Sequence, residues 1–106
     1  MKISDIFNNT IKTRHARKLF ASTLSAENLI YGEFEILYLL LKEEPLQPSK
    51  IGAQLHCEPA AVSRIIKLLS EKELITYEHD HQDRRQIFVR LTKTGKSAIN
   101  SVLSHT

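Results

Sequence analysis

The segment PSKIGAQLHCEPAAVSRIIKLLSEKELI, residues 48–75, contains two helical patterns separated by a tight turn. In the first pattern, Ile51 and Leu55 lie four residues apart, which predicts one buried stripe on a short helix. The second pattern covers residues 59–72 and has a longer apolar stripe, made of Val62, Ile65, Ile66 and Leu69. A short helix, a tight turn and a second helix with small and polar residues on its outer face predict a helix-turn-helix.

The second helix begins with a residue suited to that place. Pro59 fits the first helical position because no amide hydrogen is needed there, and Glu58 before it could cap the helix. The outer face is small at its start and basic further on, with Pro59, Ala60, Ala61, Ser63, Arg64 and Lys67. Small side chains let a helix approach base edges in a DNA major groove, where Arg64 and Lys67 could reach guanines or phosphates. A merely solvated helix face is the alternative.

The apolar pattern changes after Leu74 from helical spacing to alternation. LITYE and RQIFVRL predict two strands, residues 74–78 and 85–91, joined by HDHQDR. On the second strand one face would carry Arg85, Ile87, Val89 and Leu91, and the other Gln86, Phe88 and Arg90. A hairpin directly after a helix-turn-helix predicts a winged helix.

The hairpin turn carries Asp83, Arg84 and Arg85. An arginine at the tip of a two-stranded wing can enter the narrow, electronegative minor groove of DNA. A carboxylate two residues earlier can accept hydrogen bonds from turn amides or from the guanidinium. We therefore expect Asp83 to orient, Arg85 to insert, and Arg84 to contact a neighbouring phosphate.

A metal site is the other hypothesis for this turn. It would use His79, Asp80 and His81, with Cys57 or His56 as further ligands, because two histidines two apart on a strand point the same way. No CxxC or HExxH spacing is present, and a loop tip offers no closed shell, so we favour ordinary loop histidines over a metal.

Helical spacing predicts three further elements around this core. They are a basic helix over residues 3–20, a helix over residues 31–44 that ends before Pro45, and a last helix over residues 93–105 capped by Thr92. Residues 23–28 are expected to be a break. The predicted fold class is mainly α with a small β-hairpin (α+β), a winged helix-turn-helix in a single DNA-binding domain, residues 1–106. We divide this domain into a dimerisation helix at 1–24, a winged-helix core at 28–95 and a short C-terminal helix at 93–106.

The role of the first helix has two interpretations. Its apolar residues could pack on the core while its basic residues stay in solvent, or they could meet another chain. In the second case Ile3, Phe7 and Ile11 would form a dimer contact.

Composition fits a small globular protein. The chain has 106 residues, 42% hydrophobic and 25% charged, and its net charge of +3 is compatible with a nucleic-acid partner. The single cysteine excludes an internal disulfide and favours a reducing compartment. Without a membrane-spanning run or a signal-peptide core, we expect a cytoplasmic protein with no membrane partner. No catalytic constellation is apparent, so we expect neither an enzyme nor a cofactor.

The sequence resembles the MarR family of bacterial transcription regulators. PAAVSRIIKLLSEKELI, then DRR and LTKTG, carry the resemblance, with the family's Asp-x-Arg and Leu-Thr-x-x-Gly pattern met by Asp83, Arg85, Leu91, Thr92 and Gly95. The resemblance implies a winged-helix homodimer on double-stranded DNA, with a pseudo-palindromic operator, recognition by the helix from Pro59 and minor-groove contact by Arg85. A small-molecule effector is possible in this family, and short members of the related SarA group are similar in length.

Three features depart from the family pattern: the chain length, the residue after the recognition helix, and a shortened C-terminal helix beside the place where the family has its ligand pocket, between the dimer and DNA-binding parts. The chain is shorter than typical members, which weakens the expected C-terminal contribution to a dimer. The glycine usual after the recognition helix is replaced by Glu73, and a left-handed residue other than glycine costs about 1 kcal/mol, so the turn could adopt another shape. Cys57 is expected as a small filler at a buried turn, with oxidant sensing as the alternative. The rival function is a winged-helix module that binds another regulator rather than DNA.

Overall fold

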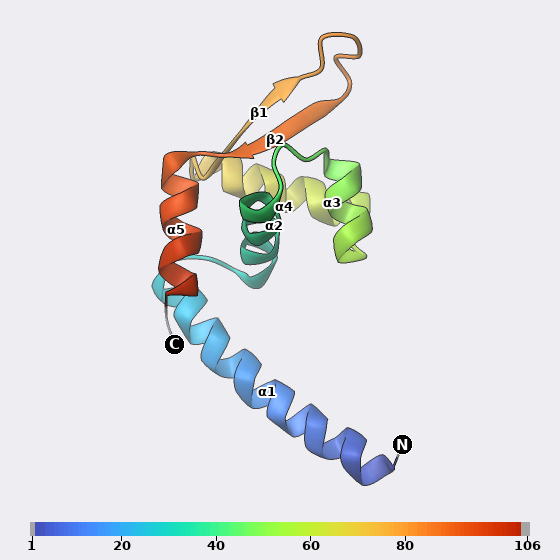
Figure 1. Cartoon of the computed structure of the whole chain (residues 1–106), viewed down its shortest axis with the longest axis vertical. Helices are drawn as coiled ribbons and strands as arrows, with labels where there is room; N and C mark the ends of the chain where they lie inside the picture. Colours follow the sequence, from blue (N-terminus) through green and yellow to red (C-terminus); the bar gives the residue numbers. More distant parts are fainter. Residues whose placement is uncertain (1, 105–106) are drawn as a thin grey trace.

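The structure, a computed structural model, describes residues 2–104 except for the side chain of Phe7. These residues form five helices and one antiparallel hairpin (Figure 1). The helices are α1 (Ile3–Ala26), α2 (Tyr31–Lys42), α3 (Pro48–Leu55), α4 (Pro59–Glu71) and α5 (Lys93–Leu103), and the strands are β1 (Ile75–His79) and β2 (Ile87–Leu91). This order confirms the predicted winged-helix class. No helix among the described residues is both long and apolar enough to cross a membrane.

The core is built around α2, which lies between the helix-turn-helix, the hairpin and α5. The residues that are at most 1% exposed come from every one of these elements, and include Leu37, Leu40, Ile51, Leu69, Val89 and Ile99. Burying a large aliphatic side chain contributes about 1.5–3 kcal/mol to the free energy of unfolding. These contacts therefore hold α3 and α4 in place through their inner, core-facing sides. The outer faces of α3 and α4 are therefore left for other partners.

The hairpin is fixed to the helical body at its base. β1 pairs with β2 in the register Ile75↔Leu91, Tyr77↔Val89 and His79↔Ile87. On the other edge of β2, Leu46 N donates to the Val89 carbonyl (3.1 Å) and Val89 N donates to the Leu46 carbonyl (2.8 Å). Residue 46 is thus a short extended piece between α2 and α3.

The helix ends confirm two sequence predictions and correct two others. Pro59 occupies the first turn of α4, and Thr92 caps α5 by accepting a hydrogen bond from Gly95 N at 3.0 Å. Glu58 stands at the N-cap, but its side chain makes no capping hydrogen bond, so the predicted cap is wrong. Glu73 keeps the left-handed conformation, with φ of 59°, so the turn does not change shape.

The turn at Glu73 is held by its neighbours. Leu74 N donates to the Leu69 carbonyl at 3.0 Å, and Thr92 Oγ1 donates to the Glu73 carbonyl at 2.7 Å. The side chain of Leu74 is 7% exposed, so the turn also buries an apolar residue. These contacts offset the cost of about 1 kcal/mol for a left-handed residue that is not glycine.

Several element boundaries differ from the sequence predictions by a few residues, and two of the differences matter for the surfaces described below. α1 continues to Ala26, so only residues 27–30 separate it from α2, because Leu24 is buried and keeps the last turn packed. β2 begins at Ile87 rather than at residue 85. Arg85 N donates to the Asp83 carboxylate instead of to a neighbouring strand, which leaves Arg85 in the loop and not on the strand face.

α1 is an arm that leaves the body at the end opposite the wing (Figure 1). Only its last turns pack on α2, where Phe20 contacts the Phe34 ring edge to face at a centroid distance of 4.7 Å. Further out, Ile3 is 84% exposed and Ile11 is 48% exposed. Packing on the chain's own core therefore accounts for the base of α1 and not for its outer half.

An ion pair between the buried Glu33 and the partly exposed Lys72 joins three helix ends. Glu33 is 1% exposed, and its Oε1 accepts hydrogen bonds from Ile30 N at the start of α2 and from Lys72 Nζ at the end of α4, each at 2.9 Å. Lys72 Nζ also donates to the Asn28 carbonyl, in the turn after α1, at 2.6 Å. This contact ties the base of the arm to the C-terminal end of α4.

Replacing Lys72 tests how much this contact stabilises the fold. Lys72→Ala leaves the Glu33 carboxylate buried without its cation, and we expect the free energy of unfolding to fall by about 2–3 kcal/mol. Urea unfolding followed by circular dichroism measures this. The matched control is Lys50→Ala, which removes a pair with Glu43 whose side chains are 52% and 59% exposed, and which should cost less than about 1 kcal/mol. Equal losses in the two variants would contradict a special role for Lys72.

Candidate nucleic-acid interface

The predicted recognition residues lie together on the outer face of α4. Ala60, Ser63, Arg64 and Lys67 are exposed and follow one another at helical spacing, while Ala61 is half-buried beside them. The opposite face carries the buried Val62, Ile66 and Leu69, which pack on the core. The hydrophobic stripe of the sequence therefore fixes which side of α4 points outward.

The two cations of α4 make no ion pair within the described part of the chain. Among the described residues, neither Arg64 nor Lys67 takes part in an ion pair or a side-chain hydrogen bond. By contrast, Lys50, Lys72, Arg85 and Arg90 each pair with a carboxylate. Arg64 and Lys67 are therefore free to contact an anion without first breaking an internal contact.

α3 and α4 pack closely enough to leave a shallow groove of small residues between them. Its volume is about 340 Å³ and it is lined by Pro48, Ser49, Gly52, Ala53, Cys57, Pro59, Val62 and Ser63. A Cβ at Gly52 would meet the Cys57 carbonyl oxygen at 3.1 Å, so a larger residue would push the two helices apart. Cys57 itself is exposed, which corrects the expectation that it fills a buried turn.

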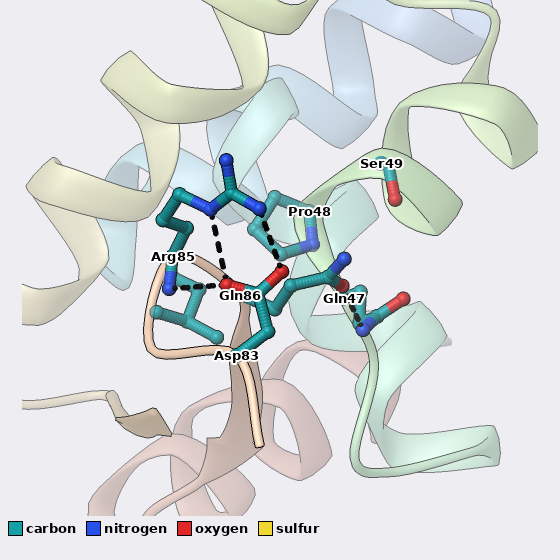
Figure 2. Close-up of a pocket in the computed structure, with 7 residues that line it drawn as sticks. Gln47, Pro48, Ser49, Asp83, Arg85 and Gln86 are labelled. Carbon is teal, nitrogen blue, oxygen red and sulfur yellow. Dashed lines mark hydrogen bonds and ion pairs between the residues drawn. The ribbon is translucent and has the colours of Figure 1, made fainter. Parts of the chain in front are cut away.

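The wing tip holds its arginine in the way expected from the turn sequence. Asp83 Oδ1 accepts from Arg85 N and from Arg85 Nε, each at 3.1 Å, and Asp83 Oδ2 accepts from Arg85 Nη2 at 3.3 Å (Figure 2). These hydrogen bonds from Arg85 hold the pKa of Asp83 below its usual value of 3.8. The Arg85 side chain is still 91% exposed, so the guanidinium is oriented and accessible together.

In the histidine-rich part of the turn, two side chains make hydrogen bonds within the loop. His79 Nδ1 donates to the Arg84 carbonyl at 2.6 Å, since a carbonyl oxygen can only accept, and Asp80 Oδ1 accepts from Gln82 N at 3.2 Å. Between residues 2 and 104, no three His, Cys, Asp or Glu side chains come together as a metal ion would need. The structure thus gives His79 and Asp80 a structural use in the loop.

The wing and α3 approach each other beside the tip. A depression of about 440 Å³ separates them, lined by Gln47, Pro48, Ser49, Asp83, Arg85, Gln86 and Ile87 (Figure 2). Across it, Gln47 Nε2 donates to Gln86 Oε1 at 2.6 Å. Sequence reasoning missed this contact, because two glutamines 39 residues apart carry no local signal.

The predicted dimer residues lie on a different part of the molecule. Ile3 and Ile11 are exposed on the outer half of α1, and the side chain of Phe7 lies outside the described residues. The structure therefore places the predicted DNA-contacting residues and the predicted dimer residues on separate surfaces, and it leaves both of their roles as predictions.

Comparison with known proteins gives a consistent result. The family model described as MarR family matches residues 29–87. An uncharacterized HTH-type transcriptional regulator of Bacillus subtilis, YwaE, is 35% identical over 85 residues, which is 80% of this chain and 50% of that protein. The chain spans about half to two thirds of the length of the curated relatives that it matches.

Two solved structures from Staphylococcus aureus have the same fold. MarR in complex with salicylate and kanamycin is 31% identical, with a TM-score of 0.83 over 94% of this chain and 67% of that chain. A mutant of MepR bound to an oligodeoxyribonucleotide is 21% identical, with a TM-score of 0.81 over 98% of this chain and 75% of that chain. The second likeness concerns the fold alone.

Removing the Asp83 carboxylate should loosen the wing tip without unfolding the protein. In Asp83→Ala we expect faster hydrogen exchange at the Arg85 amide, measured by NMR, and an almost unchanged melting temperature, since exposed substitutions have small effects. Because the pKa of Asp83 is lowered, the carboxylate stays charged as the pH falls, and the Arg85 contact should weaken only below pH 3.8. The control is Asp80→Ala in the same loop, which should leave the Arg85 amide as protected as before.

Proposed function

The chain belongs to the MarR family, and from this we propose that it is a DNA-binding transcriptional regulator that acts in the cytoplasm as a homodimer on a pseudo-palindromic operator. The observation that carries the proposal is the pairing of two features on one end of the fold. One is an exposed α4 face with small residues and two cations that pair with no acid among residues 2–104, and the other is an exposed arginine already oriented on the wing. A regulator of this kind performs no reaction and needs no cofactor.

α4 would read the major groove. Ala60 and Ala61 in its first turn allow close approach and can contact a thymine methyl group. Arg64, one turn further on, can donate two hydrogen bonds to a guanine, while Ser63 and Lys67 contact base edges or phosphates. Pro59 places the N-terminal end of α4 toward the DNA, as in other helix-turn-helix proteins.

The wing would read the neighbouring minor groove. Arg85 enters where the groove is narrow and its negative potential is strongest, which favours A·T-rich sequence. Asp83 keeps the guanidinium in one orientation before it meets the DNA, and Arg84 contacts a phosphate beside it. This division assigns sequence reading to α4 and shape reading to the wing.

The outer half of α1 would form the dimer through Ile3, Phe7 and Ile11. The exposure of Ile3 and Ile11, which no part of the described chain covers, supports this assignment. A two-fold dimer would present two α4 helices about one turn of DNA, or about 34 Å, apart. That spacing matches a pseudo-palindromic operator.

A small-molecule effector would bind between α1 and α2. An open pocket of about 660 Å³ lies between the second half of α1 and residues 29–31, and both apolar and basic side chains line it. The basic residues are Arg14, Arg17 and Lys18, and Arg17 lies over the Tyr31 ring with its guanidinium carbon 5.9 Å from the ring centroid. An aromatic carboxylate matches this combination of apolar surface and positive charge.

DNA binding is tested by comparing two cations on α4. A site is first selected from a random DNA pool, and affinities are then measured by fluorescence anisotropy over a salt series. Arg64→Ala should lower affinity for the selected site more than for random DNA, by about 1–3 kcal/mol of discrimination. Lys67→Ala should weaken binding to the selected site and to random DNA equally. It should also reduce the slope of log affinity against log salt concentration by about one, the value for one lost phosphate contact.

The control for these variants is Lys96→Ala, an exposed lysine on α5, which should bind like the unchanged chain. Equal losses on both DNAs in Arg64→Ala would make Arg64 a phosphate contact. Absence of salt-sensitive binding to any duplex would reject the proposed function and favour the rival, a module that binds another regulator.

The dimer is tested by placing charges on the outer half of α1. The double variant Ile3→Glu, Ile11→Glu should be monomeric by light scattering, because each glutamate would have to be buried without a partner at the interface. Lys12→Glu, on the same helix, changes charge without touching the apolar residues and should remain dimeric. A folded dimer in the double variant would place the interface elsewhere.

A further inference from the structure

We infer that Gln47 and Gln86 form a joint that sets the direction of the wing relative to the helix-turn-helix, so that both are positioning residues for DNA binding. This inference rests on the proposed function. Its starting point is that the wing tip, residues 80–86, is attached to the helices by very little. Within the part of the chain that the structure describes, the hydrogen bond from Gln47 Nε2 to Gln86 Oε1 is the one that links this tip to any helix or to a residue capping one.

Gln86 is also the residue that closes the tip. Its backbone N donates to the Asp83 carbonyl at 3.0 Å, and its carbonyl accepts from Asp80 N at 2.9 Å. Asp83 in turn holds the guanidinium of Arg85. If Gln86 moves, Asp83 is expected to move with it through the backbone hydrogen bond, and Arg85 through its contact with the Asp83 carboxylate.

The backbone of Gln47 is held in place by hydrogen bonds of its own and of the residue before it. Gln47 occupies the N-cap position of α3, where its backbone carbonyl accepts from Lys50 N at 3.0 Å and from Ile51 N at 3.1 Å. The residue before it, Leu46, is paired with Val89 and is 2% exposed. With its backbone held on both sides, Gln47 can fix the position of Gln86 relative to α3 and hence to α4.

The wing needs such a support because a two-stranded hairpin is not rigid by itself. Among the described residues, the backbone contact with the helical body that lies nearest the tip is at Val89, and Arg85 lies four residues before Val89, toward the tip. Figure 2 shows the two glutamine side chains meeting across the depression between the wing and α3, beside the Asp83–Arg85 pair. The joint would hold Arg85 at the distance from α4 that lets both reach adjacent grooves of one DNA.

The first part of the test needs no DNA. In Gln47→Ala, hydrogen exchange at the Asp80 and Gln86 amides should become about two- to tenfold faster, the loss expected for one hydrogen bond. Gln54→Ala replaces an exposed glutamine on the same helix and should leave both amides unchanged. Unchanged exchange in Gln47→Ala would overturn the joint.

The second part measures the two grooves separately on the selected operator. Gln47→Ala and Gln86→Ala should each weaken protection of the minor groove from hydroxyl radicals, as Arg85→Ala does, while protection of guanine N7 by α4 is retained. The double variant should lose no more than either single variant, because both changes remove the same contact. The affinity for the operator should fall by about two- to tenfold in Gln47→Ala, in Gln86→Ala and in the double variant.

The remaining outcomes separate this inference from its rivals. If Gln47 contacts a phosphate directly, Gln47→Ala will lose affinity, Gln86→Ala will not, and the joint is overturned. Additive losses in the double variant would overturn it as well. Failure of the unchanged chain to bind DNA would reject the proposed function and the role of Gln47 in it, whereas failure of the exchange experiment would reject the joint alone.

Discussion

The arrangement of this molecule depends on the buried pair between Glu33 and Lys72. One carboxylate oxygen of Glu33 accepts from Ile30 N and from the Lys72 ammonium, and the same ammonium reaches the Asn28 carbonyl. The other oxygen, Oε2, is buried with no hydrogen-bond partner in the described part of the chain. A buried carboxylate with so few partners is costly once its cation leaves, by about 3–5 kcal/mol in fully buried cases. The ends of α1, α2 and α4 are therefore held together.

This constraint connects the two surfaces that the proposed function uses. The arm formed by α1 has few contacts with the body beyond its last turns, so its direction is set near its base. Lys72 belongs to the end of α4, and the Asn28 carbonyl belongs to the turn after α1. If α1 forms the dimer, this lysine, together with the packing of Phe20 and Leu24 at the base of α1, would set the separation of the two α4 helices. A homodimer can match a fixed operator spacing only if such a connection is stiff.

Sequence reasoning was most successful where the signal is local. The helix-turn-helix, the hairpin and the starts of α4 and α5 follow from apolar periodicity and from Pro59 and Thr92, each acting within one turn of a helix. It failed where the cause is tertiary. Glu33 and Lys72 are 39 residues apart, and nothing in either segment indicates the other. The left-handed Glu73 is tolerated only because the neighbouring strand end and a buried leucine hold the turn.

The wing arginine is paired with an acid, whereas the cations of α4 are not, and this difference has a physical reason. Holding a long cationic side chain in one conformation costs up to about 2 kcal/mol of conformational entropy. A wide major groove offers several acceptors, so Arg64 and Lys67 can become ordered after contact with DNA. Both lack an acidic partner in the described structure. A narrow minor groove accepts a guanidinium in few orientations. Asp83 orders Arg85 beforehand, and it does so on a loop where the guanidinium remains open to solvent. On the proposed function, the acid in the turn would therefore serve DNA binding, although it lowers the positive charge of the surface that would face DNA.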